Sequence, residues 1–271
     1  MSPPLVEIRE LTKTYIRGGG LLSRSKAEEL RAVNRVSLDI FAGETLGLVG
    51  ESGCGKTTLG RMLLRLIEPT SGTIRFGGSD VLSASGAELR RLRRDLQIVF
   101  QDPFASLNPR MRVLDIVREP WIIHAAPGDE ANESADHRHR AAALLSAVGL
   151  EESALNRYPH EFSGGQRQRI GIARALALKP RFLVLDEPVS ALDVSVGAQI
   201  VNLLAKLQRE LGLTYLFISH SMPIVRYLST RIAVMCRGEI VETGDAVQIT
   251  SSPQHEYTRT LIAATPEVVT F

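Results

Sequence analysis

The chain has 271 residues, of which 32 are basic and 30 acidic, 44% are hydrophobic, and the mean hydropathy is +0.02. This length predicts one large domain, or one domain with a subdomain, whose core needs no disulfide bonds. The net charge of +2 is too balanced for a nucleic-acid-binding surface, so no nucleic-acid partner is expected. The apolar fraction is too high for a disordered chain.

The two cysteines, Cys54 and Cys236, lie far apart and outside any metal-ligand spacing, which is typical of a cytosolic protein. The N-terminal residues lack the apolar core of a secretory signal, and no run of about 18 apolar residues could span a bilayer. We therefore expect a soluble intracellular protein without a transmembrane segment.

The first third of the chain predicts mostly strands. Residues 6–9 and 36–40 alternate between apolar and polar side chains, so each predicts a strand with one buried face. An exposed loop is expected between them, at about residues 17–31. Residues 45–49 are apolar without alternation, as a central parallel strand requires, and a glycine-rich turn and a helix over residues 56–66 follow.

Further along the chain, strands and helices alternate. Three more apolar runs predict buried strands, at residues 96–100, 182–185 and 215–219. Residues 198–211 predict an amphipathic helix that stops at Gly212, and residues 113–172 look mostly helical. A hairpin over residues 232–241 and a short helix over residues 257–264 complete the chain. This pattern predicts an α/β fold with a mainly parallel sheet and an N-terminal antiparallel β segment.

A polar stretch at residues 127–140 contains His137 and His139. No other type of metal ligand lies at a useful spacing from these histidines. The stretch therefore predicts a solvated loop or helix face, in preference to a metal site.

Residues 50–57 match the phosphate-binding pattern G-x-x-x-x-G-K-[ST], between a predicted buried strand and a predicted helix. The glycines let successive backbone N–H groups turn toward phosphate oxygens, and the helix adds the positive end of its dipole. We expect Lys56 to reach the β- and γ-phosphates of ATP, the Thr57 hydroxyl to bind Mg²⁺, and Cys54 to be a small filler. The expected ATP-binding residues here are Gly50, Glu51, Ser52, Gly53, Cys54, Gly55, Lys56, Thr57 and Thr58.

A second half of this site is predicted where the apolar run at residues 182–185 leads into Asp186 and Glu187. Open α/β sheets bind ligands at the carboxyl ends of their strands. Asp186 is then placed to hold Mg²⁺, and Glu187 to orient or deprotonate the water that attacks the γ-phosphate.

A second anion site is predicted at residues 163–166, where Ser163 is a good N-cap and two glycines leave a helix N-terminus bare. One nucleotide rarely needs two phosphate cradles. Here the sequence resembles the ATP-binding-cassette (ABC) family, whose signature motif matches Ser163, Gly164, Gly165 and Gln166, with Phe162 where leucine is usual. The resemblance implies a head-to-tail pair of nucleotide-binding domains, in which Ser163 and Gly165 of one subunit complete the site of the other. It also implies a helical signature subdomain, at about residues 103–178.

Other family positions follow from the resemblance. It implies that Gln101 senses Mg²⁺ and the attacking water, that His220 contacts the γ-phosphate, and that Asp193 lies in the loop linking the two sites of the dimer. It further implies that Tyr15 stacks on adenine. The expected catalytic residues are Glu187, His220, Gln101 and Lys56, and the expected Mg²⁺ ligands are Thr57, Gln101 and Asp186.

The chain departs from the family pattern at two positions. Ser221 follows His220 where aspartate is usual, and Val189 follows Glu187-Pro188 where threonine is frequent. Neither change removes a group that touches phosphate, so a hydrolysing site is still expected. Ser221 is the change that bears on how the histidine loop is held.

Three segments resemble the oligopeptide, dipeptide and nickel importers of this family, in particular their F-type subunit. They are residues 101–111, 158–162 and 252–258. The resemblance implies a cassette at residues 1–245 and a C-terminal segment at residues 246–271. No iron–sulfur cluster is expected, because the chain has only two cysteines.

The same resemblance implies a peripheral location at the cytoplasmic face of the inner membrane. The implied partners are a second, paralogous ATPase subunit, two transmembrane permeases and, indirectly, an extracytoplasmic solute-binding protein. The sequence leaves the cargo open between peptides, nickel and metal chelates, and also leaves open a second copy as partner. The alternatives to an importer are an exporter ATPase, a non-transport cassette, and a module that binds ATP without turnover.

Overall fold

The computed structural model describes residues 3–17, 28–125 and 133–264. The described residues divide into two compact units, one formed by those up to residue 89 together with residues 214–264, and the other by those between residues 90 and 213. In the described ranges, no helix combines the length and apolar character needed to cross a membrane.

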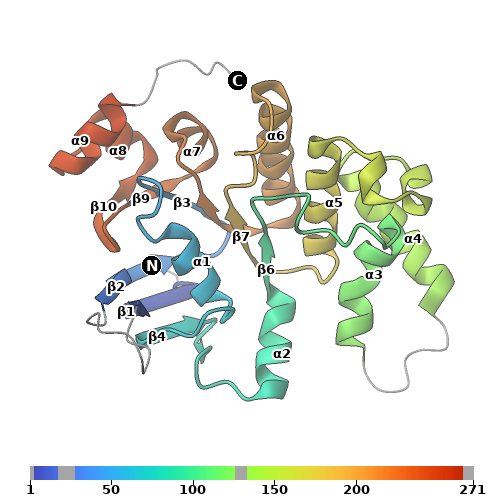
Figure 1. The fold of residues 1–271 in the computed structure, drawn as a ribbon, viewed down its shortest axis with the longest axis horizontal. Helices are drawn as coiled ribbons and strands as arrows, with labels where there is room; N and C mark the ends of the chain where they lie inside the picture. Colours follow the sequence, from blue (N-terminus) through green and yellow to red (C-terminus); the bar gives the residue numbers. More distant parts are fainter. Residues whose placement is uncertain (1–2, 18–27, 126–132, 265–271) are drawn as a thin grey trace. The chain divides into compact units, whose positions relative to one another are not determined.

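The first unit contains the predicted N-terminal antiparallel β segment, as a sheet in the order β2-β1-β4-β5. Figure 1 labels β2, β1 and β4 of this sheet. Its strands are β1 (Val6–Arg17), β2 (Glu28–Ile40), β4 (Ser71–Phe76) and β5 (Ser79–Asp80). The prediction of a loop from residue 17 to about 31 was wrong at its C-terminal end. Arg31 pairs with Thr14 and Glu28 with Arg17, so β1 and β2 stay paired beyond the residues whose alternation predicted the two strands. The rest of the expected loop, residues 18–27, lies outside the described residues.

A second group of strands in this unit runs in the order β10-β9-β3-β8. The strands are β3 (Thr45–Val49), β8 (Thr214–Ile218), β9 (Arg231–Cys236) and β10 (Glu239–Asp245). β3 is parallel to β8 and β9, whereas β10 forms the expected hairpin with β9. Every residue of β3 and β8 is buried, which is why neither segment shows apolar–polar alternation.

The helices of the first unit are α1 (Lys56–Leu63), α7 (Met222–Leu228), α8 (Ala246–Ser251) and α9 (Glu256–Ala263). α1 ends three residues before the predicted end at residue 66, because Arg65 adopts a left-handed backbone conformation (φ 48°). α9 begins one residue before its prediction, and α8 was not predicted. Figure 1 shows α8 and α9 following the β9–β10 hairpin.

The second unit contains the parallel pair β6 (Leu96–Val99) and β7 (Phe182–Asp186), which the sequence predicts within one or two residues. α2 (Gly86–Asp95) leads into this unit. The mostly helical middle of the chain is confirmed by α3 (Val113–His124), α4 (Glu133–Ala147), the 3-10 turns η2 (Glu152–Asn156) and η3 (Pro159–Glu161), and α5 (Gly164–Leu176). α6 (Val194–Leu211) ends at Gly212, as predicted, in a left-handed conformation.

Trp121 of α3 organises the helical part of the second unit. Its indole Nε1 donates a hydrogen bond to the carbonyl of Ala177 at 2.7 Å, and its ring stacks on His137 with 5.0 Å between centroids. The prediction of a solvated face was therefore wrong for His137, which is buried, although His139 is exposed. The sequence pattern around His137 is polar, and the stacking on Trp121 is a contact that this pattern does not reveal.

Candidate functional site

The phosphate-binding pattern forms a turn between the buried strand β3 and the helix α1. Gly50 and Gly55 have positive φ angles of 151° and 111°. A Cβ atom on Gly50 would lie 2.1 Å from the carbonyl oxygen of Met235, and one on Gly55 would lie 2.1 Å from that of Ala32. Only glycine permits this loop conformation at both positions, because any side chain would overlap the backbone of a neighbouring strand.

Lys56 extends back into this turn and is buried. Its Nζ donates hydrogen bonds to the carbonyl oxygens of Gly50 and Glu51, each at 2.8 Å, and lies 3.7 Å from the Cys54 sulfur. An ammonium group has three N–H donors, so these carbonyls hold the cation inside the loop. Burial raises the pKa of the Cys54 thiol, whereas the neighbouring Lys56 opposes that rise.

The remaining residues in and just after the phosphate-binding pattern differ in their exposure to solvent. Glu51, Ser52 and Gly53 are exposed, whereas Thr57 and Thr58 are partly buried in the first turn of α1. The structure thus produces the strand–loop–helix arrangement that backbone recognition of phosphate requires.

Two further predicted residues belong to the same unit. His220 follows β8, which pairs with β3 so that Ile218 lies opposite Leu48. Gly50 lies two residues after Leu48, and His220 lies two residues after Ile218. Because the two strands are parallel, His220 and the phosphate loop follow adjacent strands at the same end of the sheet. Tyr15 lies in β1 opposite Leu30, with 39% of its surface exposed and Lys13 Nζ 5.1 Å from its ring centroid.

The acidic pair belongs to the second unit, together with Gln101. Asp186 ends β7 and is buried, and Glu187 follows it with a left-handed backbone conformation (φ 47°). Val99 of β6 pairs with Leu185 of β7, so Gln101 and Glu187 leave neighbouring parallel strands. The Gln101 amide Nε2 donates a hydrogen bond to Glu187 Oε2 at 3.1 Å. The structure therefore brings together a carboxylate and an amide that the sequence separates by 86 residues.

The predicted N-cap at Ser163 is present. Its hydroxyl accepts a hydrogen bond from the Gln166 backbone N–H at 3.3 Å, while the Gln166 side chain accepts from the Ser163 N–H at 3.0 Å. This reciprocal pair forms a capping box that begins α5. Phe162, the departure from the usual leucine, is buried with Arg157 stacked over its ring at 4.4 Å.

The two signature glycines pack closely against the start of α6. A Cβ on Gly165 would lie 2.3 Å from Val196 Cγ1, and one on Gly164 would lie 3.2 Å from Leu192 Cδ2. Asp193 is the N-cap residue of α6 in the same place. The start of α5, which carries Gly165, is therefore packed on the segment around Asp193 within the second unit.

The structure shows the surroundings of Val189 and Ser221, the two residues that depart from the family pattern. Val189 is buried, as an apolar side chain should be. Ser221 is the N-cap residue of α7, and its backbone N–H donates to the Ser219 hydroxyl at 3.0 Å. Ser219 therefore supplies a side-chain acceptor beside the residue that replaces the usual aspartate.

Sequence reasoning missed a contact of Tyr257, which it assigned only to a terminal helix. The Tyr257 hydroxyl lies 3.0 Å from the Glu51 backbone nitrogen and accepts its hydrogen bond. The resemblance of residues 252–258 to a family segment marked this stretch, but nothing in its composition indicates a contact with the phosphate loop.

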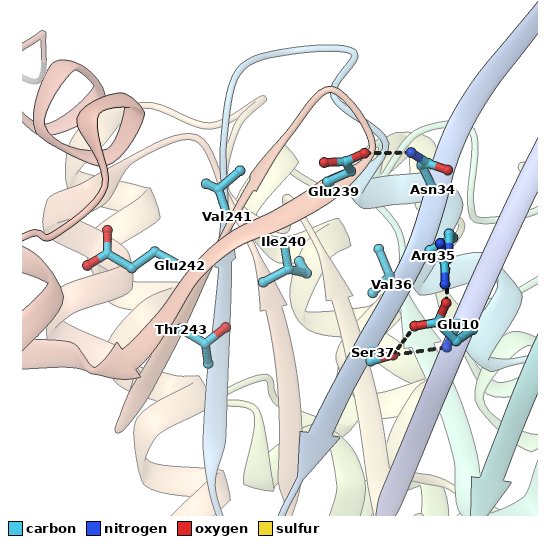
Figure 2. A pocket seen from close by; sticks show the side chains of 10 residues that line it. All are labelled: Glu10, Asn34, Arg35, Val36, Ser37, Glu239, Ile240, Val241, Glu242 and Thr243. Atoms are coloured by element: carbon cyan, nitrogen blue, oxygen red, sulfur yellow. Dashed lines mark hydrogen bonds and ion pairs between the residues drawn. The ribbon is translucent and has the colours of Figure 1, made fainter.

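Figure 2 shows a separate pocket beside β2 and β10. Its polar groups pair with one another, since Asn34 Nδ2 donates to Glu239 Oε1 and Arg35 Nε donates to Glu10 Oε2, each at 2.5 Å. None of the predicted site residues lines it. Across the described ranges, no group of three or more His, Cys, Asp or Glu side chains is arranged to hold a metal ion.

Comparisons with known proteins agree with the motifs. The ABC transporter family profile matches residues 33–190. The chain is 49% identical to the oligopeptide transport ATP-binding protein OppF of Bacillus subtilis over 98% of its own length and 84% of that protein. It is 51% identical to OppD of Mycobacterium tuberculosis over 97% of its own length, but it spans only 42% of that longer protein.

A solved structure gives the same result for the fold. The structure resembles the ATP-binding cassette MJ0796, described as a dimer in a post-hydrolysis state bound to ADP and Pi, with a TM-score of 0.77 and 33% sequence identity. That match covers 89% of this chain and 98% of the other. The mainly parallel α/β fold is therefore confirmed, and the chain belongs to the ABC transporter family.

Proposed function

We propose that this chain hydrolyses ATP to energise an ABC importer of peptides or related small solutes. The observation that carries the hydrolysis is the hydrogen bond between Gln101 and Glu187 at the carboxyl ends of two parallel strands. The observation that favours peptides is the similarity to OppF over 98% of the chain.

Lys56 and the loop around it bind the phosphates of ATP in this proposal. Two of the ammonium donors hold the loop carbonyls, and the third, 3.7 Å from the Cys54 sulfur, can exchange this weak acceptor for a β- or γ-phosphate oxygen. The backbone N–H groups from Gly53 to Thr58 and the N-terminus of α1 complete the phosphate site. Tyr15 offers an exposed aromatic face for the adenine.

Glu187 acts on the water that attacks the γ-phosphate. The Gln101 amide orients the carboxylate through one oxygen, and the carboxylate accepts a proton from the water in this proposal. His220 contacts the γ-phosphate and stabilises the charge that develops on it. Catalysis then depends mainly on positioning and charge, as in other phosphoryl transfers.

The residues proposed for Mg²⁺ have the donor chemistry that this ion prefers. Thr57, Gln101 and Asp186 offer a hydroxyl, an amide carbonyl and a carboxylate, all hard oxygen ligands. The NH₂ group of Gln101 donates a hydrogen bond to Glu187, so the carbonyl oxygen of the same amide is the atom suited to binding a cation. When bound, Mg²⁺ would neutralise charge on the β- and γ-phosphates.

A second ATPase subunit is required if Ser163 and Gly165 complete the partner's nucleotide site. The similar cassette MJ0796 is described as dimeric, which supports such pairing. We propose a paralogous partner, with Asp193 at the link between the two sites. Two permeases and an extracytoplasmic binding protein complete the importer, and the chain acts at the cytoplasmic face of the membrane.

The proposed cassette covers residues 1–245, with a helical signature subdomain at about residues 103–178, and the C-terminal segment covers residues 246–271. The α3, α4 and α5 helices all fall in the proposed subdomain. α8 and α9 fall in the C-terminal segment, which resembles that of oligopeptide importers.

Peptide cargo is favoured over nickel or metal chelates because the similar proteins are named for oligopeptides, peptides and glutathione. The test is uptake of labelled peptides and of ⁶³Ni²⁺ by cells lacking this chain, complemented with the native chain or with Glu187→Gln. We expect peptide uptake only with the native chain. Loss of nickel uptake alone would instead assign metal cargo.

Purification of the tagged chain from mild detergent tests the partners. We expect a second ABC ATPase and two membrane-spanning proteins in the eluate. Recovery of the chain without any membrane protein would contradict the transport role, and recovery of only one kind of ATPase subunit would contradict the paralogous partner.

A further inference from the structure

The contact between Tyr257 and the phosphate loop joins two distant parts of the first unit. Tyr257 is the second residue of α9, and Glu51 is the second residue of the phosphate-binding pattern. Their hydrogen bond, 3.0 Å from Glu51 N to the tyrosine oxygen, spans 206 positions in the sequence. It links the C-terminal segment to the loop that holds Lys56.

The C-terminal segment presents this hydroxyl in a fixed position. Glu242 of β10 accepts hydrogen bonds from the backbone N–H groups of Gln254 and His255, at 2.8 and 3.1 Å. His255 Nδ1 in turn accepts the Tyr257 N–H at 3.1 Å and so caps α9. Because the segment is held at three backbone N–H groups, little backbone entropy remains to be lost when the hydroxyl engages the loop.

The bond acts on one particular peptide unit. The N–H of Glu51 and the C=O of Gly50 belong to the same planar peptide group. Tyr257 holds the N–H end, and Lys56 Nζ donates to the C=O end at 2.8 Å. A rotation of this plane would break both bonds, so the orientation that satisfies Tyr257 is also the one that aims the Gly50 carbonyl at the ammonium.

We infer that Tyr257 is a positioning residue of the nucleotide site, because its hydroxyl fixes the Gly50–Glu51 peptide plane and thereby the Lys56 ammonium. The inference deepens the proposed function and depends on ATP phosphates being the ligand of the loop. Burial raises the pKa of Tyr257 above its ordinary range, so the hydroxyl is neutral at physiological pH.

Tyr257→Phe tests the inference, since it removes one oxygen and keeps the ring. The matched control is Tyr227→Phe, the same substitution at an exposed tyrosine of α7. The full-length proteins are titrated with fluorescent mant-ATP and mant-AMP, and exchange of the Glu51 amide is followed by NMR. We expect the Kd of mant-ATP to rise about fivefold in Tyr257→Phe, which is typical of the loss of one neutral hydrogen bond. Mant-AMP, which lacks the β- and γ-phosphates, should be bound as by the native protein.

The Glu51 amide should exchange with solvent faster in Tyr257→Phe than in the native protein or the control, whether or not nucleotide is present. Unchanged mant-ATP affinity with unchanged Glu51 exchange would overturn the inference. An equal loss of mant-ATP and mant-AMP affinity would also overturn it, because that result indicates general disruption. If the native protein fails to bind mant-ATP, the proposed function and the part of the inference that depends on it both fail; the exchange of the Glu51 amide then still decides whether Tyr257 holds the loop.

Discussion

Gln101 donates a hydrogen bond to the carboxylate of Glu187, with 3.1 Å between Nε2 and Oε2. The pairing follows from the parallel register of β6 and β7, which places Val99 opposite Leu185 two residues earlier on each strand. It holds the proposed base in one orientation, in a backbone conformation (φ 47°) that a glutamate rarely adopts.

Replacing this amide by a second carboxylate should alter the pH dependence of ATP hydrolysis. In Gln101→Glu, two carboxylates about 3 Å apart cannot both ionise readily, so the higher of the two pKa values of the pair rises. The base form is then present only above the raised pKa, and the rate should climb with pH across a range where the native rate is flat. Gln101→Ala, which adds no charge, should instead lower the rate at every pH. A Gln101→Glu profile that parallels the native one would contradict the pairing.

Gly165→Ala should destabilise the second unit by about 1–3 kcal/mol, because its Cβ would lie 2.3 Å from Val196 Cγ1 and valine side chains are stiff. Urea denaturation measures this change. Gly171→Ala is the matched control on α5, since a Cβ there meets nothing within 4 Å, and it should stabilise by about 0.5–1 kcal/mol. Adding Val196→Ala should relieve the overlap in Gly165→Ala. Equal changes in unfolding free energy for Gly165→Ala and Gly171→Ala would contradict the close packing of Gly165 against Val196.

Trp121→Phe should cost about 1–3 kcal/mol of unfolding free energy, because it leaves the buried Ala177 carbonyl without its indole donor. Far-UV circular dichroism during urea denaturation provides the measurement. Ile122→Ala, at the neighbouring exposed position of α3, should change stability by no more than about 0.5 kcal/mol. A tryptophan variant as stable as the native protein would contradict this packing.

Cys54 should react slowly with thiol reagents despite its place in the phosphate loop. Burial raises its thiol pKa more than the neighbouring Lys56 lowers it, so little thiolate exists at pH 7 and the fraction grows with rising pH. Maleimide labelling of Cys236→Ser, mapped by mass spectrometry, isolates this thiol. Labelling at pH 7 should be far slower in the native protein than in urea. Equal rates in the two conditions would place Cys54 at the surface.

The buried strands and the phosphate loop could be predicted because their patterns are local. The apolar run at residues 45–49 followed by Gly50 to Lys56 contains the strand, the turn and the ligand-binding groups in one stretch. Gly212 similarly marks the end of α6 by a property of glycine alone.

Three features that sequence reasoning missed depend on partners outside the local stretch of sequence. His137 is buried because Trp121 stacks on it, and β1 and β2 extend because Thr14 and Arg31 pair with each other. Tyr257 contacts the phosphate loop because α9 is anchored to β10 through Glu242. Local composition carries no signal for such contacts, which arise only when the fold brings the segments together.

The most direct test of the account compares the native complex with Glu187→Gln in a single round of ATP hydrolysis. Both are purified through the tagged chain, and bound ATP and released phosphate are measured in the same sample. The account predicts that Glu187→Gln retains ATP, because Lys56 and the phosphate loop are intact, but releases phosphate about 10²- to 10⁴-fold more slowly. Release of phosphate by Glu187→Gln at the native rate would contradict the assignment of Glu187 as the residue that activates water.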